Sequence, residues 1–150
     1  MRLKEKVAII TGCARGIGEA IAKTFAKEGA FLMINDLDKS VLSLGKELKN
    51  DQIRVNSYIG DVSDYASVKT MVNRTLDFYG KVDILINTVA LPHRKNIMET
   101  SIAEFEKIIN VNLKAAFFST KAVLPTMISR RYGRIVKISS IAGRRGGGML

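Results

Sequence analysis

The sequence alternates short apolar runs with amphipathic segments, and this alternation restricts the chain to a small set of folds. Residues 6–11 and 31–36 are apolar and rich in β-branched side chains, as strands buried on both faces are. Between them, residues 16–28 carry apolar side chains at helical spacing, and Gly29 follows as a helix C-terminal cap. This order predicts an α/β domain with a parallel sheet and right-handed crossovers.

The same pattern continues through the rest of the chain. Further strands are predicted at residues 54–61, 84–89 and 134–139, and further helices at residues 41–48, 68–79, 101–109 and 112–131. Gly80 closes the second of these helices, and Ser101 with Glu104 forms a capping box at the start of the third. Pro125 lies inside the last helix, where it predicts a kink or a lost backbone hydrogen bond. Residues 143–150 are expected to form a loop. We therefore expect one Rossmann-type domain over residues 1–150, a doubly wound parallel sheet of five strands in the order 3-2-1-4-5 with the C-terminal strands missing.

A glycine-rich turn joins the first predicted strand to the first predicted helix. Gly12 lets the chain leave the strand in a tight turn, while Gly16 and Gly18 let the backbone approach a ligand and the helix pack closely on the sheet. The helix N-terminus adds free N–H groups and a partial positive charge. A plain turn with glycines for packing is the alternative, but the position of the turn favours a pyrophosphate site. Its predicted cofactor-binding residues are Thr11, Gly12, Arg15, Gly16, Ile17 and Gly18.

Asp36 stands at the end of the second predicted strand, where a carboxylate can recognise a ribose. It can accept hydrogen bonds from the adenosine ribose hydroxyls, and it repels a 2′-phosphate, which favours NAD over NADP as the cofactor. Arg15 is able to reach a phosphate and keeps NADP open as the second choice. The alternative role for Asp36 is that of a turn or capping residue beside Asp38.

The glycine spacing is TGxxxGxG, and with the residues downstream it resembles that of the short-chain dehydrogenase/reductase family, closest to the 3-oxoacyl-carrier-protein reductase branch. The resemblance covers residues 2–150. It implies that Asp61 and Val62 contact adenine, although Asp61 also suits a turn that precedes the next helix. It further implies that Asn87 and Ala90 belong to the family's Asn-Asn-Ala-Gly run beside the cofactor, with Ala90 in place of the glycine.

The resemblance also implies a hydride transfer between a nicotinamide cofactor and a carbonyl or alcohol. Asn112 would hold a proton-relay water and Ser140 would orient the carbonyl; taken alone, the two are a helix-break asparagine and a loop serine. The family's Tyr-x-x-x-Lys pair lies beyond that serine, so we expect part of a longer reductase, inactive by itself. Tyr65 and Lys69 share this spacing but follow the third strand, and we expect an exposed helical pair there. A non-catalytic nucleotide-binding module is the alternative function.

The net charge of +10 is concentrated in the last third of the chain. Up to Glu106 there are 15 basic and 14 acidic residues, and after it 9 basic residues and no acidic one. Balancing acids in missing sequence, an acidic substrate or carrier, and nucleic acid are competing explanations. The basic residues are not regularly interleaved with aromatic ones, which argues against nucleic acid. Arg130 and Arg131 resemble the basic helix end that meets an acidic carrier protein, or they complement the helix dipole. We expect a small-molecule substrate, with a carrier-protein or coenzyme A link left open.

The remaining features concern compartment, metals and assembly. Cys13 is the single cysteine, and it would be either a buried filler or a reactive thiol near a helix N-terminus. The apolar run after the N-terminal basic residues is too short for a signal peptide or a membrane span, so a cytoplasmic protein is expected. His93 has no partners at metal-ligand spacing, so no metal site is expected. Phe117, Phe118 and Leu124 suggest a homo-oligomer through the long helix, if the full domain is present.

Overall fold

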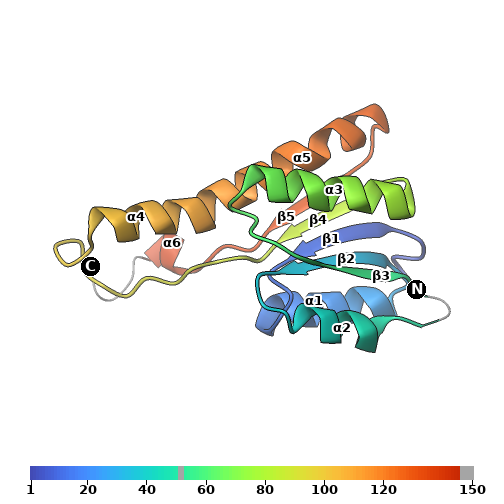
Figure 1. The fold of residues 1–150 in the computed structure, drawn as a ribbon, viewed down its shortest axis with the longest axis horizontal. Coiled ribbons are helices and arrows are strands. Elements are labelled where there is room, and N and C mark those ends of the chain that lie inside the picture. Colours follow the sequence, from blue (N-terminus) through green and yellow to red (C-terminus); the bar gives the residue numbers. More distant parts are fainter. Residues whose placement is uncertain (51–52, 146–150) are drawn as a thin grey trace.

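Five parallel strands form one sheet at the centre of the structure. The computed structural model describes residues 1–50 and 53–145. The strands are β1 (Val7–Thr11), β2 (Phe31–Asp36), β3 (Val55–Ile59), β4 (Ile84–Asn87) and β5 (Arg134–Lys137). They lie in the order β3-β2-β1-β4-β5 (Figure 1), and each neighbouring pair is parallel. This order confirms the Rossmann-type sheet that the strand–helix alternation predicts.

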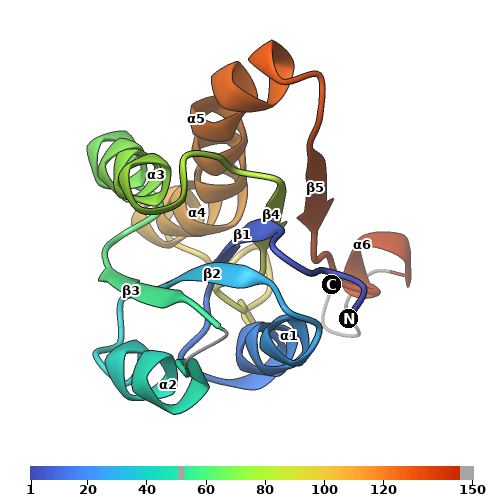
Figure 2. The ribbon, with the colours of Figure 1, turned by 90° about the vertical axis from the view of Figure 1, so that its right-hand side faces the viewer.

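Helices cover both faces of this sheet. They are α1 (Gly16–Lys27), α2 (Val41–Leu48), α3 (Tyr65–Tyr79), α4 (Ile102–Ile109), α5 (Ala115–Ser129) and the short α6 (Ala142–Arg145). Figure 2 shows α1 and α2 on one face and α3 and α5 on the other. α4 continues beyond the carboxyl ends of the strands (Figure 1). The arrangement gives a parallel sheet the two covered faces that it needs.

The two faces are held by two separate apolar cores. Ile9 and its register partner Met33 pack under α3 and α5, whereas Ile10 and Ile34 point to the opposite side, toward α1 and α2. Side chains alternate in this way because successive residues of a strand point to opposite faces. All of β1 is buried. Each such side chain stabilises the fold by roughly 1.5–3 kcal/mol relative to exposure, so the central strands form a rigid base for whatever lies at their ends.

The long helical region differs from the sequence prediction in one respect. Ser101 and Glu104 form the predicted capping box at the start of α4. The helix then continues through a π-helical turn, η1 (Asn110–Lys114), directly into α5. The predicted interruption near residue 110 is therefore wrong, because the π turn absorbs the extra residue without ending the helix. Pro125 lies inside α5 and does not break it, as predicted.

Several element boundaries also need correction. The strands predicted at residues 84–89 and 134–139 end at Asn87 and Lys137. The third strand covers residues 55–59 rather than 54–61, because the chain turns away at Gly60, whose N–H donates to the Asp36 carbonyl. The predicted C-terminal loop is wrong for residues 143–145, which belong to α6. This turn forms because the Ser140 hydroxyl accepts the Ala142 N–H (3.2 Å) in the manner of a helix cap. The rest of that predicted loop lies outside the described residues.

Candidate functional site

The carboxyl ends of β1, β2 and β4 meet at one edge of the sheet, where the winding direction of the chain changes. Between β1 and α1 the glycine-rich turn crosses this edge (Figure 1). Gly12 and Gly16 have φ angles of 73° and 63°. Both lie in the left-handed region that side chains rarely adopt. In open α/β sheets, such a reversal point is where ligands bind.

The first and third glycines of the turn are in close contact. A Cβ atom at Gly18 would lie 2.0 Å from the Gly12 carbonyl oxygen, and one at Gly12 would lie 2.7 Å from the Thr88 hydroxyl. A side chain at Gly18 would require the backbone to move, and one at Gly12 would displace the Thr88 hydroxyl. Gly16 is different, because a Cβ atom there would meet nothing within 4 Å. The turn is therefore packed tightly on its inner side and open on its outer side, which forms a cradle for a ligand.

The N-terminus of α1 presents its backbone N–H groups without a side-chain cap. Arg15 occupies the N-cap position in an extended conformation, and its side chain makes no capping hydrogen bond in the described part of the chain. By contrast, Asp64 caps α3 and Ser101 caps α4. The first N–H groups of a helix have no intrahelical acceptor, and they carry the positive end of the helix dipole. This donor set suits an anionic diphosphate.

Hydrogen bonds to neighbouring strands hold the turn in place. The Cys13 N–H donates to the Asn35 carbonyl (3.0 Å), and the Ala14 N–H donates to Asp36 Oδ2 (2.8 Å). The Cys13 side chain is buried and donates to the Ile10 carbonyl, and burial raises the pKa of this thiol to about 12. The thiol therefore stays protonated near neutral pH. Cys13 is the buried filler of the turn, and the reactive-thiol alternative is wrong.

Asp36 links the glycine-rich turn to the connection after β2. Besides the Ala14 N–H, its carboxylate accepts the Asp38 N–H (Oδ1···N 3.0 Å), which is the turn role given above as an alternative. Asp36 is only half-buried, and it borders a hollow of about 60 Å³. The hollow is also lined by Asn35, Leu37, Gly60, Asp61, Val62 and Val89. The structure thus brings Asp36 together with the predicted adenine pair, Asp61 and Val62.

The two members of that pair have different environments. Val62 is buried in the core under α3 and α5. Asp61 is exposed, and its Oδ1 accepts hydrogen bonds from the N–H (2.8 Å) and the hydroxyl (2.7 Å) of Ser63. Asp61 therefore shapes the turn before α3, while Asp64 caps that helix through the N–H groups of Ala66 and Ser67.

Asn87 ends β4 beside the glycine-rich turn. Its side chain is buried, and Nδ2 has no hydrogen-bond partner among the described residues. An unpaired buried donor is costly, so this atom is suited to bind an incoming acceptor. Thr88 follows and donates its hydroxyl to the turn, a contact that the sequence analysis missed. Ala90 is exposed two residues later.

Asn112 and Ser140 come to the same edge from two other elements. Asn112, in the π turn, accepts the Leu91 N–H through Oδ1 (2.7 Å) and donates through Nδ2 to the Leu91 carbonyl (3.1 Å). Ser140 is exposed after β5, and that strand end is joined to β4 by the Ile138 N–H, which donates to the Asn87 carbonyl (2.9 Å). The Asn112 side chain is hydrogen-bonded to Leu91 in the loop after β4. The Ser140 side chain is hydrogen-bonded to the start of α6.

A sequence profile described as short chain dehydrogenase matches residues 6–150. The chain belongs to the short-chain dehydrogenase family. It is 38% identical over 144 residues to the 3-oxoacyl-[acyl-carrier-protein] reductase FabG of Thermotoga maritima, covering 95% of this chain and 58% of that protein. It is also 38% identical over 149 residues to the (2S)-[(R)-hydroxy(phenyl)methyl]succinyl-CoA dehydrogenase subunit BbsD of Thauera aromatica, covering 99% of this chain and 60% of the relative.

A solved structure has the same fold. NAD+-bound xylitol dehydrogenase superposes with a TM-score of 0.92 at 28% identity, covering 98% of this chain and 57% of the other. The chain thus spans under two thirds of the length of these relatives. As to membranes, none of the helices within the described ranges combines the length and apolar character that a bilayer span requires.

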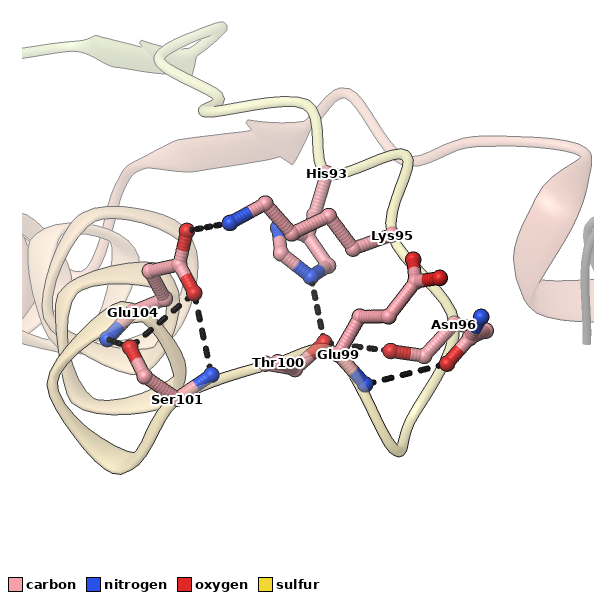
Figure 3. Close-up of polar contacts among 7 residues, drawn as sticks. All are labelled: His93, Lys95, Asn96, Glu99, Thr100, Ser101 and Glu104. Atoms are coloured by element: carbon pink, nitrogen blue, oxygen red, sulfur yellow. Dashed lines mark hydrogen bonds and ion pairs between the residues drawn. The ribbon is translucent and has the colours of Figure 1, made fainter.

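In this member of the short-chain dehydrogenase family, polar contacts hold the loop between β4 and α4 (Figure 3). Lys95 Nζ and Glu104 Oε1 form an ion pair at 2.5 Å, and His93 Nε2 shares a hydrogen bond with the Thr100 hydroxyl (2.7 Å). The Lys95 ammonium and the hydrogen bonds from Ser101 lower the pKa of Glu104 to about 2. His93 has this polar partner, and no cluster of potential metal ligands occurs in the described residues. The sequence analysis did not anticipate Lys95, because its partner is nine positions away.

Tyr65 and Lys69 lie in a groove between α3 and α5. The Tyr65 ring packs against Phe118 with 5.3 Å between ring centroids, and Lys121 Nζ lies 5.4 Å from the Tyr65 ring centroid. Phe118 therefore turns inward, while Phe117 and Leu124 of α5 are exposed. The predicted exposed pair is confirmed for Lys69 but wrong for Tyr65, which is half-buried because its ring packs on Phe118.

Arg130 forms an ion pair with a buried carboxylate in the core of the fold. Its guanidinium donates to Asp83 (Nη2···Oδ1 2.9 Å), whose fully buried carboxylate also accepts the Val7 N–H and pairs with Lys81 at 3.2 Å. Burial raises the pKa of Asp83, but these partners outweigh it and hold the pKa below its ordinary value. Arg130 is thus an ion-pair partner of a buried acid, a role that neither sequence interpretation foresaw. Arg131 remains exposed.

Proposed function

We propose that this chain binds NAD across the carboxyl edge of its sheet, as the cofactor-binding part of an oxidoreductase. The observation that carries the proposal is the uncapped N-terminus of α1 beside a turn whose inner side accepts only glycine. A diphosphate offers the anionic acceptors that these N–H groups lack. When bound, the nicotinamide of such a cofactor accepts or donates a hydride.

Each predicted binding residue has a part in this proposal. The backbone of Arg15, Gly16, Ile17 and Gly18 would hold the diphosphate, with Thr11 and Gly12 setting the course of the turn. Asp36 would accept the ribose hydroxyls, and Asp61 and Val62 would border the adenine in the small hollow. Asn87 and Ala90 would lie along the nicotinamide half, where the unpaired Nδ2 of Asn87 has a hydrogen bond to give.

The acidic side chains after β2 favour NAD over NADP. A 2′-phosphate on the ribose would approach the carboxylates of Asp36 and Asp38. Arg15 is the one basic residue of the turn, and its charge lies in the field of Asp38. Hydrogen bonds from Ser40 lower the pKa of Asp38 first, and the nearby Arg15 charge lowers it further.

The substrate proposal is a carbonyl or alcohol, with a link to a carrier protein or to coenzyme A left open. Relatives named for acyl-carrier-protein and succinyl-CoA substrates support this class. Ser140 would orient the carbonyl and Asn112 would support a proton relay. Tyr65 packs against Phe118, and Lys69 lines the same α3–α5 groove, away from the carboxyl edge of β1. We therefore also propose that these 150 residues bind the cofactor without turnover.

Calorimetric titration with NADH and NADPH, together with an assay on a panel of ketones, tests this function. We expect NADH to bind, NADPH to bind more weakly, and no ketone to be reduced. Absence of NADH binding would overturn the cofactor proposal, while turnover of a ketone would overturn only the proposed inactivity.

A further inference from the structure

We propose that Thr88 is a positioning residue that restrains the backbone carbonyls at the start of the glycine-rich turn. Through this restraint it sets the affinity for the dinucleotide, a consequence that rests on the proposed function. Thr88 follows β4 directly. Its hydroxyl donates to the Thr11 carbonyl (Oγ1···O 2.5 Å) and lies 3.3 Å from the Gly12 carbonyl oxygen. In the family pattern given above, an asparagine stands at this place, so this contact is made by a side chain that departs from that pattern.

The Thr88 hydroxyl occupies the space between two glycines. A Cβ atom at Gly12 would be 2.7 Å from Oγ1, and one at Gly18 would be 2.8 Å from it. The same hydroxyl thus lies beside the end of β1 and the turn, and it fills the space that a side chain at Gly18 in α1 would need. Since the Gly12 carbonyl oxygen also presses on Gly18, the hydroxyl lies at the point where these three parts of the backbone come together.

The other side of the turn is held from β2. The Cys13 N–H donates to the Asn35 carbonyl and the Ala14 N–H donates to Asp36. Thr88 restrains the opposite side of the turn. It does so at the carbonyls of Thr11 and Gly12, which precede these two N–H groups in the chain. With both sides fixed, the peptide planes after Gly12 have one orientation, and the N–H groups at the start of α1 face outward. Without the hydroxyl, the Thr11–Gly12 peptide at the start of the turn loses its hydrogen bond from the β4 side.

Three variants of the full 150-residue chain test this inference. Thr88→Val keeps the shape and removes the hydroxyl, and Thr88→Ser keeps the hydroxyl. The matched control is Thr75→Val, because the Thr75 hydroxyl likewise donates to a carbonyl, that of Met71 (2.8 Å), inside α3 and far from the turn. NADH affinity is measured by titration of its fluorescence. We expect Thr88→Val to weaken binding about five- to tenfold, the factor that one net hydrogen bond provides, and the other two variants to bind within twofold of the parent.

Amide hydrogen exchange supplies a readout that needs no cofactor. In Thr88→Val, the Cys13 and Ala14 amides should exchange about five- to tenfold faster relative to amides of the β1 core. Thr88→Ser and Thr75→Val should leave that ratio unchanged. Unchanged exchange in Thr88→Val, or equal acceleration in Thr88→Ser, would overturn the positioning role. If the parent chain binds no NADH while the exchange ratios behave as expected, the proposed function fails and the positioning role stands.

Discussion

Two glycines with similar positive φ angles allow a sharp test of where the ligand lies. Gly16 and Gly80 have φ angles of 63° and 73°, and a Cβ atom added at either one meets nothing within 4 Å. Gly16 opens α1 at the carboxyl edge of the sheet, whereas Gly80 follows the C-terminus of α3. Alanine at either position therefore adds the same backbone strain, and only Gly16→Ala adds a methyl group in front of the candidate diphosphate site.

The expected magnitudes follow from this geometry. Left-handed backbone costs a non-glycine residue roughly 1–2 kcal/mol, and the lower entropy of the unfolded chain returns roughly 0.4–1 kcal/mol. Each variant should thus lose about 1 kcal/mol of unfolding free energy and about 2–4 °C in Tm. For NADH, loss of one hydrogen bond to a charged group corresponds to at least about a tenfold weaker Kd. We expect this loss in Gly16→Ala and none in Gly80→Ala.

Thermal unfolding followed by circular dichroism, and calorimetric titration with NADH, measure the two quantities on the same samples. Similar Tm shifts with a weakened Kd in Gly16→Ala alone would support the site. Unchanged NADH affinity in Gly16→Ala would refute the reasoning, and so would an equal loss of affinity in Gly80→Ala.

Three other predictions concern charge and assembly. Asp36→Asn should shift the Kd ratio of NADPH to NADH toward NADPH by about tenfold or more, measured by titration with both; an unchanged ratio would remove Asp36 as the selecting residue. Asp83 has a pKa lowered in the folded state. Its contribution to stability is therefore present above the ordinary carboxyl range and disappears as the pH falls through the lowered pKa. Urea unfolding between pH 3 and 7, roughly the range around the ordinary carboxyl pKa, should show the unfolding free energy decline toward low pH. Asp83→Asn should make this decline shallower. Parallel pH dependences of the parent and the variant would contradict the account. The exposed Phe117 and Leu124 on α5 lead us to expect a dimer by light scattering, with Phe117→Glu as a monomer; a monomeric parent would count against α5 as the interface.

Sequence patterns predicted most of the architecture because local rules determined it. The β1 and β2 runs are apolar on both faces, and only a doubly covered parallel sheet buries such strands. The capping box at Ser101 and the left-handed glycine after α3 depend on residues three or four positions apart, and both are present as predicted. The turn glycines were predictable for the same reason, because the local backbone requires a positive φ angle at Gly12 and Gly16.

The features that escaped prediction depend on contacts between distant segments. Thr88 binds the Thr11 carbonyl across 77 positions, and Arg130 binds Asp83 across 47. No periodicity or spacing reveals such pairs. The π turn at Asn112 is likewise tied to Leu91 by two hydrogen bonds that form only once β4 and the long helix are in place.

The most direct test of the central claim is a crystal structure of this chain grown with NADH. We predict the diphosphate within hydrogen-bond distance of the backbone N–H groups of residues 15–18, and the ribose on the Asp36 carboxylate. The claim would be contradicted if NADH bound at another place. It would also be contradicted if a side chain of the protein accepted the hydrogen bonds of those N–H groups instead of the diphosphate.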